Sequence, residues 1–555
     1  MSLMGGLYVG VSGLQTSQNA LNTTAHNVTN AENEGYVRQQ VMQATNVYNT
    51  IKTTLYGVSD QQIGLGVVYA KTRQVRDVFL DTTYRRELGR QSFYEVGADA
   101  LGEIENLLDE MNGETFQLSL NSLWESVQEL AKDPSSAVTQ GLFVERCSEF
   151  LARGQAVYQG LTDYQRTLND QVKSIVYDIN SYAARIKELN DQIRNIEVGG
   201  FEVANDLRDE RNALLDKLSA IGNISYQEDA DFTVTVQFEG EDLVRGEVAY
   251  KLGAQMDGNT GFYNVFWIKN ASATFNDAGE PVYSTEEVLK AKVFDLDRII
   301  SSYINTDIGK LNSTILARGD HKADYTDLSA EKYTNHVSQS VCMNTMAEFD
   351  QLIHNVATQI NQILSDAADK ARTINPGTNY LRDSKGNPIQ VFQKIASNGY
   401  DEAGNLIPED PEVNESLYTT TNMIINVDLL QQPTRLGFVL PDGSVDFATM
   451  EVMKSAFTEE TNILNINVKK KSSFVDYYSD LVSQVANSGF MYNAKLQSQQ
   501  QTVNSAFNAR EQIIGVSTDE EMTSMIKFQN AYNASSRYIN VVDEMLEHII
   551  NTLGS

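Results

Sequence analysis

The residues that could carry chemistry in this chain are five histidines, two cysteines and 74 aspartates and glutamates. Histidine and carboxylate side chains transfer protons or bind metal ions, and a cysteine thiolate is a nucleophile. These roles depend on spacing, as in the HExxH pattern of zinc peptidases. That pattern begins at none of the histidines, which are His26, His321, His336, His354 and His548. The sequence therefore predicts no metal site and no catalytic histidine.

The other signatures of catalysis and cofactor binding are also missing from the sequence. It contains no GxxxxGK[ST] or GxGxxG loop for phosphate groups and no GxSxG elbow for a nucleophilic serine. Cys147 lies between Phe143 and Phe150 on a predicted helical face, where we expect a buried thiol, and it forms no CxxC pattern with Cys342. We therefore expect a protein that is not an enzyme, has no catalytic residues and carries no cofactor.

The net charge of −31 limits the possible partners. Nucleic-acid binding requires basic patches, so we expect no nucleic-acid partner. Anionic membrane surfaces are disfavoured as well, and no run of 18 apolar residues predicts membrane insertion. The N-terminus lacks the basic residue and hydrophobic segment of a secretory signal peptide, which by itself indicates a cytoplasmic protein.

The strongest predicted element is a helix from Ser517 to Leu553. Its apolar residues recur at steps of three and four, as on a helix that lies along another helix. Ser517, Asp519 and Glu520 form a favourable helix start. A fully exposed seam would forgo about 12–24 kcal/mol of burial as an upper estimate, so we expect it to have a partner. The predicted interface consists of Met525, Phe528, Tyr532, Ile539, Val542, Leu546, Ile549 and Leu553.

The first 31 residues contain no Asp, Glu, Lys or Arg and show a second seam of this kind. Its glycines weaken a helix by about 1 kcal/mol each relative to alanine, so the segment needs support from a partner. We predict that it pairs with the C-terminal helix, and the alternative is an ordinary core helix. The predicted N-terminal assembly residues are Leu7, Val11, Leu14, Leu21 and Val28.

Helical periodicity dominates the chain between its two ends. Residues 36–72 alternate like strands or a hairpin. Gly199 and Gly200 separate two long apolar series, which predicts an antiparallel helical hairpin. The predicted helices cover residues 77–109, 116–132, 136–154, 168–196, 203–221 and 474–514.

Residues 222–455 combine strand and helix signals. Phe232–Phe238 alternates as a strand does, and a helix is predicted around Met346–Ile363. The expected fold class is mainly α with an α+β insert: terminal coiled-coil helices, a long antiparallel helical bundle and outer β-rich domains, nested so that the N- and C-termini pair. The predicted domains are residues 1–40 with 515–555 (terminal coiled coil), 41–221 with 456–514 (helical bundle) and 222–455 (outer mixed α/β region of one or two subdomains).

Residues near both termini resemble the signature of flagellar axial proteins, the rod, hook and hook-associated proteins. The C-terminal match begins with Gly515–Met522 and includes Phe528 and Gln529. The internal stretch Ala204–Leu218 is similar to the hook-associated proteins that form the junction between hook and filament. The N-terminal motif residues are Ser12, Gly13, Asn27, Gly35, Tyr36, Arg38 and Gln39.

This resemblance implies a structural component of the bacterial flagellum, exported through the flagellar type III apparatus and only transiently cytoplasmic. The terminal helices would form the inner tube of a helical array, and the outer domains would project from it. The implied partners are copies of this chain, the hook protein, a second hook-associated junction protein, and an export chaperone on the C-terminal helix.

Two other interpretations stay open. The first is another axial protein, such as a hook or distal-rod component. The second is an adhesin or hydrolase carried on the flagellum, with its activity in residues 222–455.

Overall fold

The computed structural model describes residues 3–33, 35–53, 60–109, 115–200, 202–276, 279, 281–395, 400–401 and 406–553. The chain divides into two compact units. The terminal unit comprises Met1–Gln91, Tyr177–Leu252 and Ser498–Ser555, and the central unit comprises Ser92–Val176 and Gly253–Gln497. The predicted domain boundaries at residues 40, 221, 455 and 514 stay a prediction.

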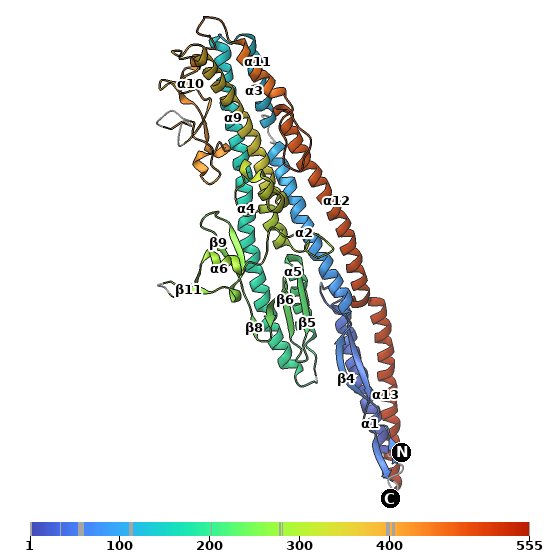
Figure 1. Ribbon diagram of the computed structural model, residues 1–555. Helices are drawn as coiled ribbons and strands as arrows, with labels where there is room; N and C mark the ends of the chain where they lie inside the picture. The colour runs from blue at the N-terminus through green and yellow to red at the C-terminus, as the bar shows by residue number, and fades with distance from the viewer. Residues whose placement is uncertain are drawn as a thin grey trace. The chain divides into compact units, whose positions relative to one another are not determined.

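The two ends of the chain lie side by side as helices α1 (Leu3–Thr29) and α13 (Thr518–Leu553) of the terminal unit (Figure 1). The Ser517 hydroxyl accepts a hydrogen bond from the Glu520 N–H at 3.4 Å, which caps the start of α13. Asp519, Glu520 and Glu521 follow in its first turn, where the helix dipole favours negative charge. The predicted pairing of the N- and C-termini is confirmed.

A long hairpin follows α1 and packs against it. Its base is formed by β1 (Gln39–Thr45) and β4 (Val67–Gln74), and its tip by β2 (Asn49–Thr53) and β3 (Asp60–Ile63), each pair antiparallel. This confirms the extended segment predicted over residues 36–72. Gly66 has φ of +90°, and a Cβ added there would lie 2.1 Å from the Ser12 hydroxyl. Glycine is therefore required where the hairpin crosses α1.

The predicted helical hairpin is present as α4 (Ala137–Glu197) and α5 (Asn205–Ile221). The helix predicted from residue 136 continues beyond residue 154 and joins the series predicted over residues 168–196 in one helix of 61 residues, which contributes to both units. After α5, a four-stranded antiparallel sheet is formed by β5 (Ile224–Glu228), β6 (Val234–Phe238), β7 (Glu241–Arg245) and β8 (Val248–Ala249).

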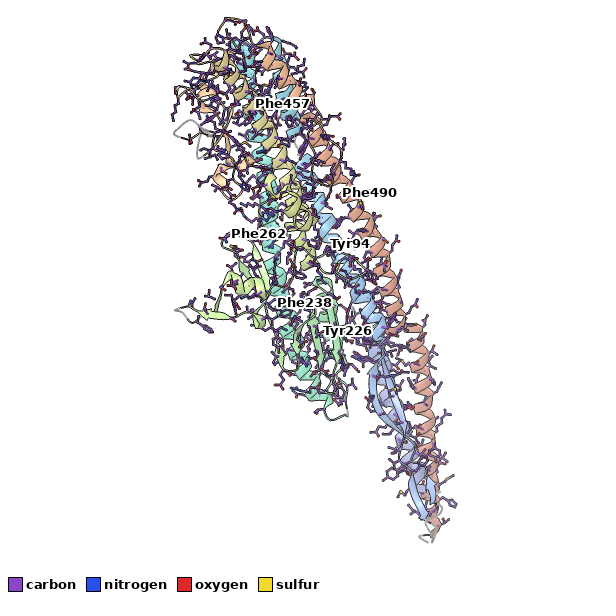
Figure 2. All side chains as sticks on the ribbon, in the orientation of Figure 1. Tyr94, Tyr226, Phe238, Phe262, Phe457 and Phe490 are labelled. Carbon is purple, nitrogen blue, oxygen red and sulfur yellow. The ribbon has the colours of Figure 1, made fainter. Side chains whose placement is uncertain are left out.

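The central unit is built around an aromatic core. The Phe116 ring lies 4.9 Å from Phe349 and 4.8 Å from Tyr478, between ring centroids. Phe457, which is labelled in Figure 2, stacks on Trp124 with 5.6 Å between the ring centroids. Such rings bury the most apolar area per residue and dominate core energetics. The long helices of this core are α2 (Val78–Asp109), α3 (Phe116–Lys132), α9 (Val341–Ile374), α11 (Phe447–Thr458) and α12 (Phe474–Ile514), of which α2 and α12 continue into the terminal unit.

Short elements fill the rest of residues 252–440, which explains the mixed strand and helix signals there. The strands are β9 (Leu252–Met256), β10 (Tyr263–Trp267), β11 (Ala273–Phe275), β12 (Pro281–Tyr283), β13 (Phe392–Lys394) and β14 (Met423–Ile425). The helices are α6 (Thr285–Lys290), α7 (Lys310–Arg318), α8 (Ala330–Asn335) and α10 (Val427–Gln431). The 3-10 turns are η1 (Ile268–Asn270), η2 (Tyr325–Leu328), η3 (Val337–Gln339), η4 (Asn414–Ser416), η5 (Thr420–Asn422) and η6 (Pro433–Leu436). The expected fold class, mainly α with an α+β insert, is confirmed.

Candidate functional site at the paired chain ends

Near its start, α1 contacts α13 through Gly6, Gly10 and Gly13. A Cβ added to Gly10 would lie 2.6 Å from Cγ1 of Ile539, and one added to Gly13 would lie 2.7 Å from the Ser535 hydroxyl. Both separations are shorter than van der Waals contact, so the two backbones approach more closely than larger side chains would permit. Glycine, which weakens α1 as an isolated helix, is what lets it pack on α13.

Of the predicted interface residues of α13, Ile539 and Val542 lie next to glycines of α1. The set as a whole is covered to different degrees. Val542 is buried, with 4% of its surface exposed, and Ile549 is exposed. The side chain of Leu553 lies outside the described part of the structure. Half-buried positions are Met525, Phe528, Tyr532, Ile539 and Leu546.

The predicted apolar residues of α1 flank the glycine contact instead of forming it. Val11 is exposed, with 45% of its surface accessible. The other four, Leu7, Leu14, Leu21 and Val28, are half-buried. Pairing of α1 with α13 therefore leaves apolar surface accessible on both helices of a single chain.

Four of the seven N-terminal motif residues meet in one hydrogen-bonded node with the start of α13. Asn27 is buried, and its side-chain N–H₂ donates to the Gln39 carbonyl at 2.8 Å and to Oε2 of Glu521 at 3.0 Å. Its carbonyl oxygen accepts from the Tyr36 hydroxyl at 2.8 Å and from the Gln39 N–H at 3.0 Å. Arg38 completes the node, because its Nε donates to Oε1 of Glu521 at 2.8 Å.

The other three motif residues have local roles. The Ser12 hydroxyl accepts from the Val67 N–H at 3.3 Å and so fixes the base of the hairpin on α1. Gly13 lies against Ser535. Gly35 is exposed and has φ of +82°, which turns the chain after α1 toward Tyr36.

Burial and nearby acidic side chains keep the Tyr36 phenol in this node protonated. Burial, followed by the charges of Asp209, Asp206 and Glu521, raises the pKa of Tyr36 well above its usual value. The phenol therefore stays protonated and donates its hydrogen bond at any ordinary pH. The backbone joins the ends too, since the Arg38 N–H donates to the Ile514 carbonyl at 2.8 Å.

Helix α5 carries a second set of contacts, which hold the segments next to the node. One carboxylate oxygen of Asp209 accepts from the Val37 N–H at 3.3 Å, and the other accepts from Nε2 of Gln74 at 2.7 Å. Burial raises the pKa of Asp209 to about 7, although the Val37 N–H, Arg76 and Gln74 act in the opposite direction. Asp209 thus ties the segments before and after the hairpin to α5.

Asp216 lies two turns further along α5 and joins it to two other helices. Its carboxylate pairs with Nε of Arg85 on α2 at 2.6 Å and with Nη1 of Arg510 on α12 at 2.9 Å. Both guanidinium groups are nearly inaccessible to solvent, so the pairs are charge-assisted bonds in a low-dielectric setting.

The sequence predicted a helix over residues 203–221 and a family resemblance at Ala204–Leu218, but it assigned no role to Asp209 or Asp216. Their spacing of seven places both on one face of a helix. That signal was present, but paired acids carry little information in a chain with 74 of them.

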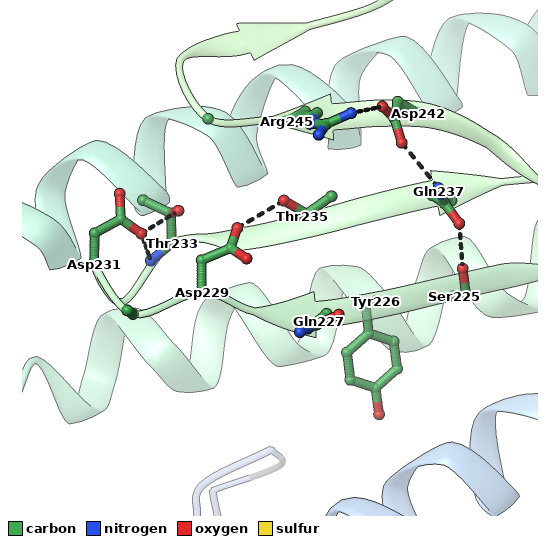
Figure 3. A pocket seen from close by; sticks show the side chains of 12 residues that line it. Ser225, Tyr226, Gln227, Asp229, Asp231, Thr233, Thr235, Gln237, Asp242 and Arg245 are labelled. Carbon is green, nitrogen blue, oxygen red and sulfur yellow. Dashed lines mark hydrogen bonds and ion pairs between the residues drawn. The ribbon is translucent and has the colours of Figure 1, made fainter.

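A polar hollow of about 760 Å³ lies over the exposed face of the β5–β8 sheet (Figure 3). Its side chains bond to one another along the strands. Gln237 accepts from the Ser225 hydroxyl at 3.0 Å and donates to Asp242 at 3.0 Å, and Asp242 also pairs with Arg245 at 2.9 Å. This arrangement resembles a solvated sheet face more than a ligand site.

Across the described residues, we find no helix whose length and hydropathy would allow it to cross a bilayer.

Comparison with known proteins places these features in context. Residues 101–293 match the family described as the flagellar hook-associated protein FlgK helical domain. Residues 7–36 match the flagella basal body rod protein family, and residues 513–552 match the flagellar basal body rod FlgEFG protein C-terminal family. The two rod-family matches cover most of α1, the motif as far as Tyr36, and most of α13, the helices that pair in the structure.

The similarity to curated proteins extends over the whole chain. Flagellar hook-associated protein 1 of Bacillus subtilis is 25% identical, over 99% of this chain and 98% of that protein. The protein of the same name from Escherichia coli is 23% identical, over 98% of both. In fold, the chain resembles the flagellar hook junction protein FlgK from Burkholderia pseudomallei, with a TM-score of 0.52 and 12% identity over 79% of this chain and all of that one.

These findings confirm the resemblance to the hook-associated branch of the flagellar axial proteins. The names describe flagellar components and no reaction, and they confirm the prediction that the chain is not an enzyme.

Proposed function

We propose that this chain, which resembles flagellar hook-associated protein 1 from end to end, is a structural component of the flagellum that forms the junction between hook and filament. The observation that carries the proposal is the node of Asn27, Tyr36, Arg38 and Gln39 with Glu521. It joins the two segments that match the rod-protein families, and it makes one paired unit of both chain ends.

Assembly of that unit into a helical array is supported by the apolar surface that pairing leaves accessible. On α1 this surface includes Val11, with Tyr8 exposed one turn away and Met4 two turns away, and on α13 it includes Ile549. Apolar side chains gathered on paired helices gain free energy when a further helix covers them. We assign the cover to the terminal helices of neighbouring copies, which would form the inner tube.

The remaining partners follow from the same assignment. At the ends of the array, the hook protein and a second hook-associated junction protein would contact this chain. Before export through the type III apparatus, a chaperone would bind the interface residues of α13. In this proposal residues 1–40 with 515–555 line the tube, the helical bundle supports them, and residues 222–455 face outward.

Gene deletion tests the proposed place in the flagellum. A strain that lacks this chain should build hooks but carry no attached filaments, because the hook would have no adaptor for the filament. Electron microscopy of isolated hooks gives the measurement. Normal filaments in the deletion strain would contradict the junction role, and missing hooks would favour the alternative of a rod or hook component.

Substitutions at accessible and covered apolar positions test the assembly surface. Val11→Asp should leave the isolated chain folded, because Val11 is already half in solvent, yet it should block assembly and motility. Val542→Asp should also unpair α1, because Val542 is buried beside Gly6. The matched control for Val11→Asp is Asn22→Asp, at an exposed polar position of α1. Motile strains with both valine substitutions would refute the assignment.

A further inference from the structure

A cluster of imidazole and carboxylate groups lies in the central unit. Asp320 and His321 follow the end of α7, and His336 follows the end of α8. One ligand atom from each of these three side chains lies within 4.8 Å of the other two. All three are about one-third exposed, so an ion can reach them from solvent.

The Asp320 carboxylate stands between the two rings. Its Oδ1 lies 2.7 Å from Nδ1 of His321, and its Oδ2 lies 2.6 Å from Nε2 of His336. The two imidazoles are nearly parallel, at 15° with 6.2 Å between their centroids. One nitrogen of each ring therefore points to the same small volume as the carboxylate.

The outer nitrogen of each ring is held by a second carboxylate. Nε2 of His321 lies 3.1 Å from Oδ2 of Asp327, and Nδ1 of His336 lies 2.9 Å from Oδ1 of Asp297. A histidine that binds a metal almost always donates its other N–H to a carboxylate or carbonyl in this way. Once the inner proton has been displaced, that bond would keep the remaining N–H on the outer nitrogen and leave the inner lone pair for the metal.

The backbone around the cluster is fixed by its surroundings. Gly319 ends α7 with φ of +77°, and a Cβ there would lie 2.0 Å from Sδ of Met343, so the chain turns tightly against α9 just before Asp320. Buried Gln165 of α4 donates to the carbonyls of Arg318 and His321 at 2.7 and 2.8 Å. Asp327 also accepts from the Asp324 N–H at 3.0 Å and is thereby held in place.

We propose that Asp320, His321 and His336 form a Zn²⁺ site, with Asp297 and Asp327 as the carboxylates that orient the two imidazoles. Two imidazole nitrogens and one carboxylate oxygen suit zinc, whereas Ca²⁺ and Mg²⁺ prefer oxygen ligands alone. Three protein ligands leave the fourth tetrahedral position to water.

Zinc binding would replace the hydrogen bonds between Asp320 and the two imidazoles by metal–ligand bonds. Without the metal, a proton lies between Asp320 and each ring; the ion displaces these protons to solvent and takes their place. Zinc ligands about 2.0 Å from the ion lie about 3.3 Å apart, so the nitrogen–oxygen separations widen by about half an ångström. The ion would then cross-link the segments after α7 and α8, and through Asp297 the segment before α7.

Metal titration of the full chain tests the proposal. Purified protein is stripped with chelator and titrated with Zn²⁺ against a chromophoric competitor of micromolar affinity, which masks weak binding by surface carboxylates. We expect one Zn²⁺ per chain, and a tetrahedral absorption spectrum when Co²⁺ is used instead. His321→Gln and His336→Gln should each lower the Zn²⁺ affinity at least tenfold, and His548→Gln on exposed α13 should leave it unchanged. The absence of one-equivalent binding, or equal affinity in all variants, would overturn the site.

Asp297→Asn keeps the test decisive if either glutamine variant fails to fold. The Asp297 side chain is 56% exposed, and the substitution leaves the three ligands in place. Because Asp297 acts through His336, we expect about a 10–100-fold loss of Zn²⁺ affinity while the tetrahedral Co²⁺ spectrum persists. Unchanged affinity in a folded Asp297→Asn protein would mean that the cluster is a set of ion pairs only.

Discussion

At the scale of single residues, Asn27 and Glu521 join positions 494 residues apart in the chain. The Asn27 side chain has one donor group and one acceptor, and each is used twice in this node. A buried amide with all of these partners fixes one geometry for the chain after α1. The motif therefore encodes the approach of α1 to α13 by hydrogen bonding, while the glycines encode it by shape.

Removal of the Asn27 amide should destabilise the terminal unit. Asn27→Ala leaves the half-buried Gln39 N–H without its acceptor and removes one donor from the Glu521 carboxylate, which keeps Arg38, at a cost of about 1–3 kcal/mol in the free energy of unfolding. Amide hydrogen exchange in α1 and α13 measures the effect. Asn22→Ala, on the exposed side of α1, is the control, and equal exchange rates in the two variants would show that the node is not structural.

The raised pKa of Asp209 predicts a pH dependence with an unusual sign. Its pKa is about 7 in the folded chain and 3.8 ordinarily, so the folded state binds the extra proton between about pH 4 and pH 7. Stability from this group is therefore present at the acid end and declines as pH rises to about 7. Buried Glu348 and Asp350, with pKa values also raised to about 7, act in the same direction.

Asp209→Asn isolates that contribution, because asparagine does not titrate. Chemical denaturation at pH 4 to 8 should show a shallower decline in the variant than in the parent chain. The difference in slope between the two plots of unfolding free energy against pH should be confined to the range below about pH 7. Parallel curves across the whole range would contradict a raised pKa at Asp209.

At the scale of elements, helix α1 shows what a hydrophobic pattern can and cannot reveal. The three-four pattern predicted the helix and its pairing with α13, and both are present. The pattern could not reveal that glycines form the close contacts, because glycine adds nothing to an apolar series. In the sequence, these glycines indicate only a low helix propensity. In the structure, their missing side chains let α13 approach the backbone of α1 closely.

Two glycine substitutions separate helix propensity from packing. Alanine stabilises an exposed helix position by about 1 kcal/mol relative to glycine. Gly5→Ala should show this gain, because its Cβ would have no neighbour within 4 Å. Gly10→Ala should instead destabilise the α1–α13 pair, since overpacking costs about 1–3 kcal/mol and its Cβ would meet Ile539. Thermal unfolding of both variants checks the opposite signs, and a gain at both positions would exclude tight packing.

Most other elements were predictable from local pattern alone, and the departures have physical causes. The helices over residues 116–132 and 474–514 match α3 and α12. The helix predicted from residue 136 does not end at residue 154, because the residues between the two apolar series keep a helical conformation. The Asp320, His321 and His336 cluster could not be predicted, since its members come together through turns at Gly319 and after α8.

At the scale of the whole molecule, the terminal unit is assembled from three separate stretches of chain. Helix α1 depends on this arrangement most, because four glycines within its 27 residues make it unstable alone. Its helical state is therefore a property of the complete chain.

Truncation after Ile514 tests that dependence. Loss of α13 should unfold α1 as well, so the helical circular dichroism should fall by more than the 36 residues of α13 can account for. The excess should correspond to about the 27 residues of α1, and hydrogen exchange should still show a protected central unit. A loss limited to α13 would mean that the β1–β4 hairpin suffices to hold α1.

Because the terminal unit is discontinuous in sequence, its parts cannot pack together until the last of them has been synthesised. Its first segment ends at residue 91 and its last begins at residue 498, so most of the chain must be synthesised before the two can meet. At about 5–20 residues per second, translation of the intervening residues takes roughly 20–80 seconds. During that interval the central unit has local contacts with which to begin folding, whereas α1 has no partner. The last residues to be made therefore decide when the first ones become ordered.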